Sequence, residues 1–185
     1  MSRSRILGWL KRSLDSLRRE RSVAWDPQPA RDADGNVIPH DDPVSIPAEM
    51  AILRHVHPIQ WTRDNNRGGE WRAQSAAFTY SNDGSKSMSI DCWPPMTAAG
   101  LEKTHYAFKE GKGVVELQAE LVRVLGFRVG TEPIPGKNPH HAGIWPPDSQ
   151  VEVWSRSMAD KKRRELSRTQ TFVSREPGFD DMGGT

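Results

Sequence analysis

The feature of this sequence that most constrains its fold is the gathering of apolar residues into one stretch, from residue 48 to residue 154. Residues 23–47, ahead of it, hold five prolines, and the chain after Trp154 is strongly polar. Because prolines favour extended backbone and leave little to bury, only the middle stretch can supply a hydrophobic core. A stretch of this length can fold without disulfides or metals. We therefore predict one domain over 48–154, a linker over 23–47, and a charged helix with a disordered tail over 155–185.

Turn signals inside the middle stretch divide it into short strands and helices. The Asp-Gly pair within 81–85 separates two β-type segments, 71–80 and 87–93, which predicts a β-hairpin. The strand–helix–strand pattern over 113–131 is too short for a full crossover unit, which argues against a doubly wound sheet. The fold class predicted is α+β, a small mixed or antiparallel sheet with two or three short helices against one face. The other elements expected are a helical turn over 48–53, an extended segment over 56–61, a helix over 97–109, edge strands over 141–145 and 151–154, and a charged helix over 157–168.

An amphipathic helix is predicted over residues 4–21, ahead of the domain. Residues 1–22 contain seven Arg and Lys side chains against two acids, so this end is strongly basic. A basic helix with one apolar stripe fits a partner's groove or a membrane surface, and docking onto the chain's own core is the alternative. In a eukaryote the same stretch would be similar to a mitochondrial presequence. The residues expected to bind a partner are Leu7, Trp9, Leu10, Leu14 and Leu17.

The cysteine content, the apolar runs and the charge of the chain indicate its cellular location and the classes of partner it can bind. A single cysteine, Cys92, allows no intramolecular disulfide. No signal peptide and no long apolar run is present, which indicates a cytoplasmic protein. Residues 23–185 contain 19 basic and 22 acidic side chains, and a slightly acidic body makes nucleic-acid binding unexpected. The oligomeric state is left open.

The histidines are the first candidates for chemistry. His55 and His57 alternate along one segment, so on a strand both side chains face the same side. His140 and His141 follow Pro139 in a predicted loop. Imidazoles from the two segments could bind a divalent metal such as zinc, with Asp91 or Cys92 completing the shell, although no zinc-binding spacing such as H-E-x-x-H is present. The metal ligands proposed are His55, His57, His140 and His141.

Two further catalytic arrangements are weaker. Cys92 could pair with His105 or His141, although a cysteine in mid-strand is more often a small buried apolar residue. Arg54, Ser75 and Glu116 occur in the order that some ADP-ribosyltransferases use to hold NAD. Val114 stands where those enzymes carry an acidic residue or glutamine two positions before the glutamate.

Several short segments give the chain a resemblance to a group of small bacterial proteins. They are Leu53–Pro58, Ser75–Phe78, Met88–Ile90 and Asn138–Ala142. The resemblance covers roughly residues 48–145 and implies a bacterial origin, and it adds interest to Arg54, His57, Ser75 and His141. It implies no activity.

Two functions therefore follow as alternatives. The favoured one is a binding or accessory protein whose helix over 4–21 engages a partner protein or a membrane surface. The other is a small metal-assisted hydrolase, which requires the two histidine segments to converge in space. Its proposed catalytic residues are His57, His141, Arg54 and Glu116.

Overall fold

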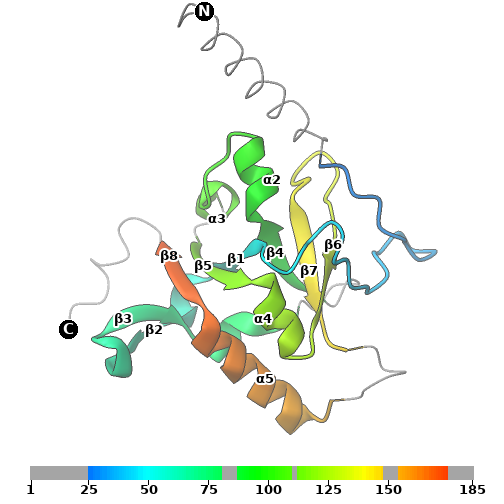
Figure 1. Cartoon of the computed structure of the whole chain (residues 1–185). Coiled ribbons are helices and arrows are strands. Elements are labelled where there is room, and N and C mark those ends of the chain that lie inside the picture. Colours follow the sequence, from blue (N-terminus) through cyan, green and yellow to red (C-terminus); the bar gives the residue numbers. More distant parts are fainter. Residues whose placement is uncertain (1–24, 81–86, 110–111, 148–153, 175–185) are drawn as a thin grey trace, which may run out of the picture.

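A computed structural model describes residues 25–80, 87–109, 112–147 and 154–174 (Figure 1). The predicted helix over 4–21, the Asp-Gly turn, residues 151–153 and the chain after 174 lie outside the described residues. Within the described ranges, no helix has the length and apolar character needed to cross a membrane.

The fold is α+β and is built on a six-stranded sheet in which every neighbouring pair is antiparallel. The strand order is β6-β7-β4-β1-β5-β8, so neighbours in the sheet are mostly distant in sequence. The predicted strands at 113–118, 127–131 and 141–145 are confirmed, although the last lies inside the sheet and not at its edge. The strands are β1 (Ala51–Val56), β4 (Met88–Cys92), β5 (Gly113–Gln118), β6 (Arg128–Thr131), β7 (His141–Trp145) and β8 (Thr171–Ser174).

The predicted hairpin between residues 71–80 and 87–93 is wrong. β3 (Glu70–Ala73) pairs with β2 (Trp61–Asp64) in a separate two-stranded sheet, whereas β4 pairs with β1 and β7. The chain after β3 leaves the strand conformation at a 3-10 helix, η3 (Ser75–Phe78), whose last two side chains are buried. A turn signal is local, so it cannot reveal that the strands on either side of the turn pair with strands elsewhere in the chain.

Four α-helices and three 3-10 helices are present in the described ranges. The helix expected over 97–109 is wrong, because the chain forms two short helices separated by a turn in which Gly100 has a φ of +75°. The helical turn expected over 48–53 is also wrong, since its second half, residues 51–53, belongs to β1. The helices are α2 (Trp93–Ala98), α3 (His105–Lys109), α4 (Ala119–Val124), α5 (Arg156–Thr169), η1 (Pro58–Gln60), η2 (Asn65–Arg67) and η3.

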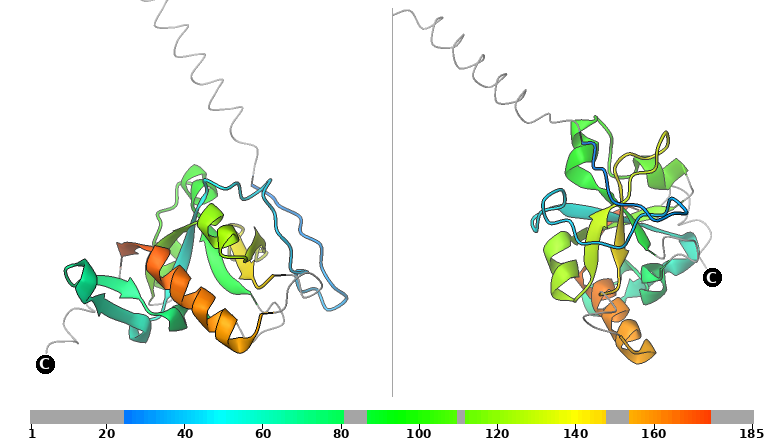
Figure 2. Two further views of the ribbon diagram at one scale, coloured as in Figure 1. Left: turned by 60° about the horizontal axis from the view of Figure 1, so that its bottom comes forward. Right: turned by 90° about the vertical axis from the view of Figure 1, so that its right-hand side faces the viewer.

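Helices cover both faces of the large sheet, and not one face as predicted (Figures 1 and 2). On one face, Leu53 and Val114 pack against Met96 of α2 and Ala107 of α3. On the other face lies the larger core, to which α4, α5 and η3 contribute buried side chains. Leu166 of α5 is fully buried there, so the charged helix after residue 155 is packed onto the domain.

The proline-rich stretch is irregular, as its composition predicts, but it also packs against the sheet. Ile46 is fully buried, and the backbone N–H of Asp42 donates to the carbonyl of Val129 on β6 at 2.9 Å. Asp41 forms an ion pair with Arg123 at 2.8 Å. Residues 25–47 therefore form one side of the folded unit and do not hang from it as a free tether.

Candidate functional site

A cavity of about 640 Å³ opens where β1 and β4 separate. The pairing of these strands ends at Arg54 and Ile90, after which β1 continues along β5 and the start of β4 continues along β7. The gap between the diverging strands exposes polar side chains that a continuous sheet would cover. These side chains include Arg54, His55, His57, Ser89, Asp91 and His141.

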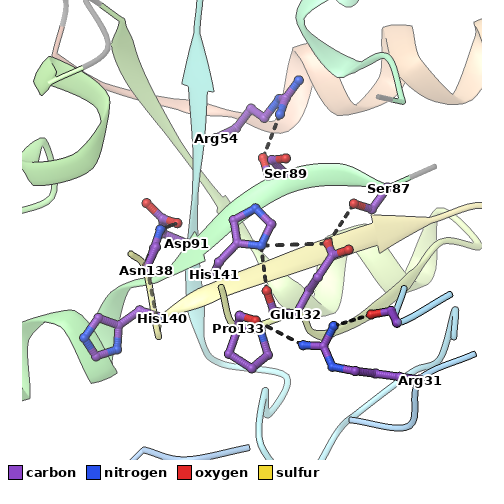
Figure 3. A network of polar contacts seen from close by, with 11 residues as sticks. Arg31, Arg54, Ser87, Ser89, Asp91, Glu132, Pro133, Asn138, His140 and His141 are labelled. Atoms are coloured by element: carbon purple, nitrogen blue, oxygen red, sulfur yellow. Dashed lines mark hydrogen bonds and ion pairs between the residues drawn. The ribbon is translucent and has the colours of Figure 1, made fainter. Parts of the chain in front are cut away.

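Arg54 bridges the gap between the separating strands (Figure 3). Its Nε donates to the carbonyl of Ala77 at 2.8 Å, and its Nη1 donates to the carbonyl of Ser89 at 2.7 Å. Burial lowers the pKa of the guanidinium to about 10. The structure places no described carboxylate in an ion pair with Arg54, and its Nη2 has no described partner yet is accessible to solvent. The side chain is thus a cation held in place by neutral groups.

Asp91 lies behind His55 on the cavity wall. Its side chain is 1% exposed, and its Oδ2 accepts a hydrogen bond from Nε2 of His55 at 2.8 Å. Its Oδ1 accepts a second hydrogen bond from the Asn138 amide at 2.7 Å. Because a buried carboxylate needs such partners, the three side chains fix one another's orientation.

His141 is held by Glu132. The Nδ1 of His141 lies 2.8 Å from the Glu132 carbonyl, which can only accept a hydrogen bond. Nδ1 therefore donates, and in the neutral ring Nε2 carries the lone pair. The Glu132 carboxylate lies 3.8 Å from the same Nδ1 and accepts a hydrogen bond from Ser87 at 2.8 Å. Nε2 has no described partner and is open to solvent, so His141 presents a base to the cavity.

Gly143 provides the space that the Glu132 carboxylate occupies over β7. A Cβ at this position would lie 2.9 Å from Oε2 of Glu132 and 2.6 Å from Cη2 of Trp145. Real Cβ atoms are not found that close to other heavy atoms. A side chain at this position would therefore displace the Trp145 ring, the Glu132 carboxylate or both.

Both histidine segments contribute side chains to this cavity. His55, His57 and His141 line the same cavity, although they come from opposite ends of the domain sequence. The side chain of His140 points away from that of His141 (Figure 3), and it is not part of the lining. No group of three His, Cys, Asp or Glu side chains within the described ranges is placed to hold a metal ion. The geometry therefore gives no support to a metal centre made of His55, His57, His140 and His141.

The remaining candidates lie apart from the cavity. Glu116 forms an ion pair with Lys103 and is not part of the lining, and Ser75 on η3 is also outside it. Arg54, Ser75 and Glu116 therefore do not share one site. Cys92 is fully buried, and burial raises the pKa of its thiol, so it is not poised as a nucleophile. The predicted partner-binding side chains between Leu7 and Leu17 lie outside the described residues.

Sequence reasoning missed three contributors to the site. Ser89 and Asn138 lie in segments that carry the bacterial resemblance, but neither was singled out. Glu132 carries no sequence signal of a role in the site, since an acidic residue between a strand and a proline is typical of a loop. The burial of its carboxylate against β7 is a tertiary feature with no local signal.

No protein-family model, curated protein or solved structure matches this chain. The fold and the site define it as a small α+β protein with a polar cavity lined by histidines.

Proposed function

We propose that this protein is a small hydrolytic enzyme whose active site is the cavity between β1 and β4, with His141 as the general base. The observation that supports the proposal is the hydrogen bonding of the two nitrogens of the His141 ring. Its Nδ1 is fixed by Glu132, and its Nε2 faces the solvent-accessible cavity without a described partner. A positioned imidazole is the commonest general base in enzymes, because its ordinary pKa lies near neutral pH.

The chemical step needs only a water molecule and the substrate. The Nε2 of His141 accepts a proton from water as the water oxygen bonds to the electrophilic carbon or phosphorus. The bond between that carbon or phosphorus and the leaving group then breaks, and the protonated ring gives its proton to the leaving group, so that the enzyme ends the cycle unchanged. The Glu132 oxygens close to Nδ1 stabilise the imidazolium that forms between the two transfers.

His55 supplies a second imidazole on the same wall. Asp91 holds the Nε2 of that ring, so the orientation of His55 is fixed relative to the cavity. His57 lines the cavity too and is exposed, which places it at the rim. His141 thus activates the water molecule, and Asp91 positions His55.

The helix expected over residues 4–21 is compatible with this function. A basic amphipathic segment at one end of the chain could bring the enzyme to a partner or to a membrane surface. That role and a cytoplasmic location stay predictions, and neither supports the enzymatic proposal.

The test compares two neighbouring histidines in the full chain. Wild type, His141→Gln and His140→Gln are assayed against a panel of chromogenic carboxyl esters, amides and phosphate esters, each with and without added zinc. His141→Gln should reduce kcat/KM by about 10²- to 10⁴-fold, whereas His140→Gln should retain most of the activity. Thermal unfolding of all three proteins checks that each is folded.

Two results would overturn the proposal. One is equal activity of the two variants, which would mean that the ring facing the cavity has no special role. The other is a wild-type protein that turns over no member of the panel. Activity that requires zinc and survives His141→Gln would return the function to a metal-assisted mechanism.

A further inference from the structure

The described lining of the cavity that contains His141 holds more basic than acidic side chains. Its described lining contains three basic side chains, Arg54, Lys112 and Lys137, and a single carboxylate, Asp91. The histidines add further hydrogen-bonding nitrogens. The Asp91 carboxylate is already engaged by His55 and Asn138, and no described carboxylate forms an ion pair with Arg54. A cavity of this composition favours an anionic ligand.

Arg54 is the central feature of this charge distribution. A half-buried guanidinium is costly unless a negative group compensates it, and the Ala77 and Ser89 carbonyls are neutral. These two hydrogen bonds fix the plane of the guanidinium and leave Nη2 without a described partner. A planar, fixed guanidinium binds phosphate or carboxylate oxygens with little further loss of side-chain freedom.

We infer that Arg54, with Lys137, forms a phosphate-binding subsite, and that the substrate is a small phosphorylated molecule. This inference rests on the proposed function and adds the substrate class to it. A guanidinium and an ammonium together suit a dianionic phosphate better than a carboxylate with one charge. The volume of about 640 Å³ is larger than a phosphate group needs, so it leaves space for the rest of a small molecule.

The position of Ser89 connects the subsite to the proposed base. Ser89 lies on β4 between Arg54 of β1 and His141 of β7, as Figure 3 shows. It also lines both the main cavity and an adjoining cavity of about 360 Å³ that His141 shares. A molecule whose phosphate is held by Arg54 would therefore extend past Ser89 toward Nε2 of His141.

The inference is tested by calorimetric titration of the full chain with inorganic phosphate and phenyl phosphate, and separately with acetate and benzoate. The phosphates should bind at least about tenfold more tightly than the carboxylates. Arg54→Gln should weaken phosphate binding by about tenfold or more, since it removes a charge-assisted hydrogen bond. His141→Gln should still bind phosphate, because it changes the base and leaves the subsite intact.

Lys137 provides a variant that does not depend on the packing around Arg54. Its side chain is exposed, so Lys137→Glu should keep the melting temperature while weakening phosphate binding by several-fold. Lys161→Glu makes the same change of charge on α5, outside the cavity, and should have little effect. If Arg54→Gln is unfolded, the comparison of Lys137→Glu with Lys161→Glu tests the phosphate-binding subsite in its place.

The possible failures are distinct. Wild-type protein that binds no phosphate, or binds carboxylates as tightly, would overturn the subsite while the role of His141 stands on its own assay. Equal phosphate binding by Lys137→Glu and Lys161→Glu, or no effect of Arg54→Gln in a folded protein, would overturn it as well. Phosphate binding without any turnover would keep the subsite and remove the proposed hydrolytic function.

Discussion

Oδ2 of Asp91 lies 2.8 Å from Nε2 of His55, and the Asp91 side chain is almost completely removed from solvent. The two residues come from neighbouring strands, β4 and β1, at the point where the strands begin to separate. The contact therefore joins β1 to β4 at the cavity wall, and it both shapes the cavity and stabilises the sheet.

Replacing Asp91 should destabilise the fold. Asp91→Asn removes the carboxylate that accepts from His55 and presents an amide where Asn138 also offers one. Loss of hydrogen bonds to a buried charged group costs roughly 1.5–3 kcal/mol each, so we expect a fall of that size in the free energy of unfolding. Urea denaturation measures it, with Glu49→Gln as an exposed control. Equal stability of both variants would show that the Asp91 interactions contribute nothing net.

A pair of glycines tests the placement of Glu132. Gly143→Ala should push the Glu132 carboxylate away from His141, because the new Cβ would lie 2.9 Å from Oε2. Gly130→Ala, at the partner position on β6, clashes with His40 and does not contact Glu132. Each should lose roughly 1–3 kcal/mol of stability through overpacking. At a temperature where both are folded, only Gly143→Ala should also lose kcat/KM. Equal loss of activity would contradict the proposed role of Glu132.

The stability of the protein should fall as the pH decreases through the ordinary pKa of histidine. Burial lowers the pKa of His140 below its usual 6.5, an effect that Asp91 opposes, and its Nδ1 is buried without a described partner. Below pH 6.5 the unfolded chain therefore binds this proton more readily than the folded protein does, so stability is lost on acidification.

His140→Gln isolates that contribution. The slope due to one group is at most about 1.4 kcal/mol per pH unit, and the variant should lack it. Urea denaturation at several pH values between about 7.5 and about 5.5 gives the difference between wild type and variant. A difference that does not change with pH would show that His140 titrates alike in both states.

The C-terminal helix should be part of the cooperative unit. Leu166 is fully buried in the main core, whereas Met158 on the same helix is 39% exposed. Leu166→Ala should cost roughly 2–5 kcal/mol and Met158→Ala much less. Thermal or urea unfolding compares the two. Similar small effects would indicate that α5 is not packed as described.

The thiol of Cys92 should be unreactive in the native protein. Its side chain is fully buried at the end of β4, and burial raises its pKa, so thiolate is scarce and inaccessible. Ellman's reagent should titrate one thiol in denaturant and essentially none under native conditions. Rapid reaction of the folded protein would mean that β4 opens readily or that the thiol is exposed.

The sequence by itself determined the class of the fold and several of its local elements. The predictions of the strand over 113–118 and of the helix after it agree with the structure because their sequence signals are local. These signals are β-branched residues, then helix formers, then Gly126, which has a φ of +92°. The charged helix near 157–168 is likewise a local pattern. The chemical types of the candidate site, histidines with a carboxylate and Arg54, were also visible in the sequence.

Only the tertiary structure decided which strands pair with one another and which side chains line the cavity. β4 pairs with β1 and β7 and not with the segment before it, since strand partners are selected by packing between distant parts of the chain. That pairing places His141 beside Asp91, and the separation of β1 from β4 opens the cavity. The same geometry turns His140 away and leaves Glu116 with Lys103. His140 and His141 are neighbours in the sequence, yet only His141 lines the cavity, because the two side chains point in different directions.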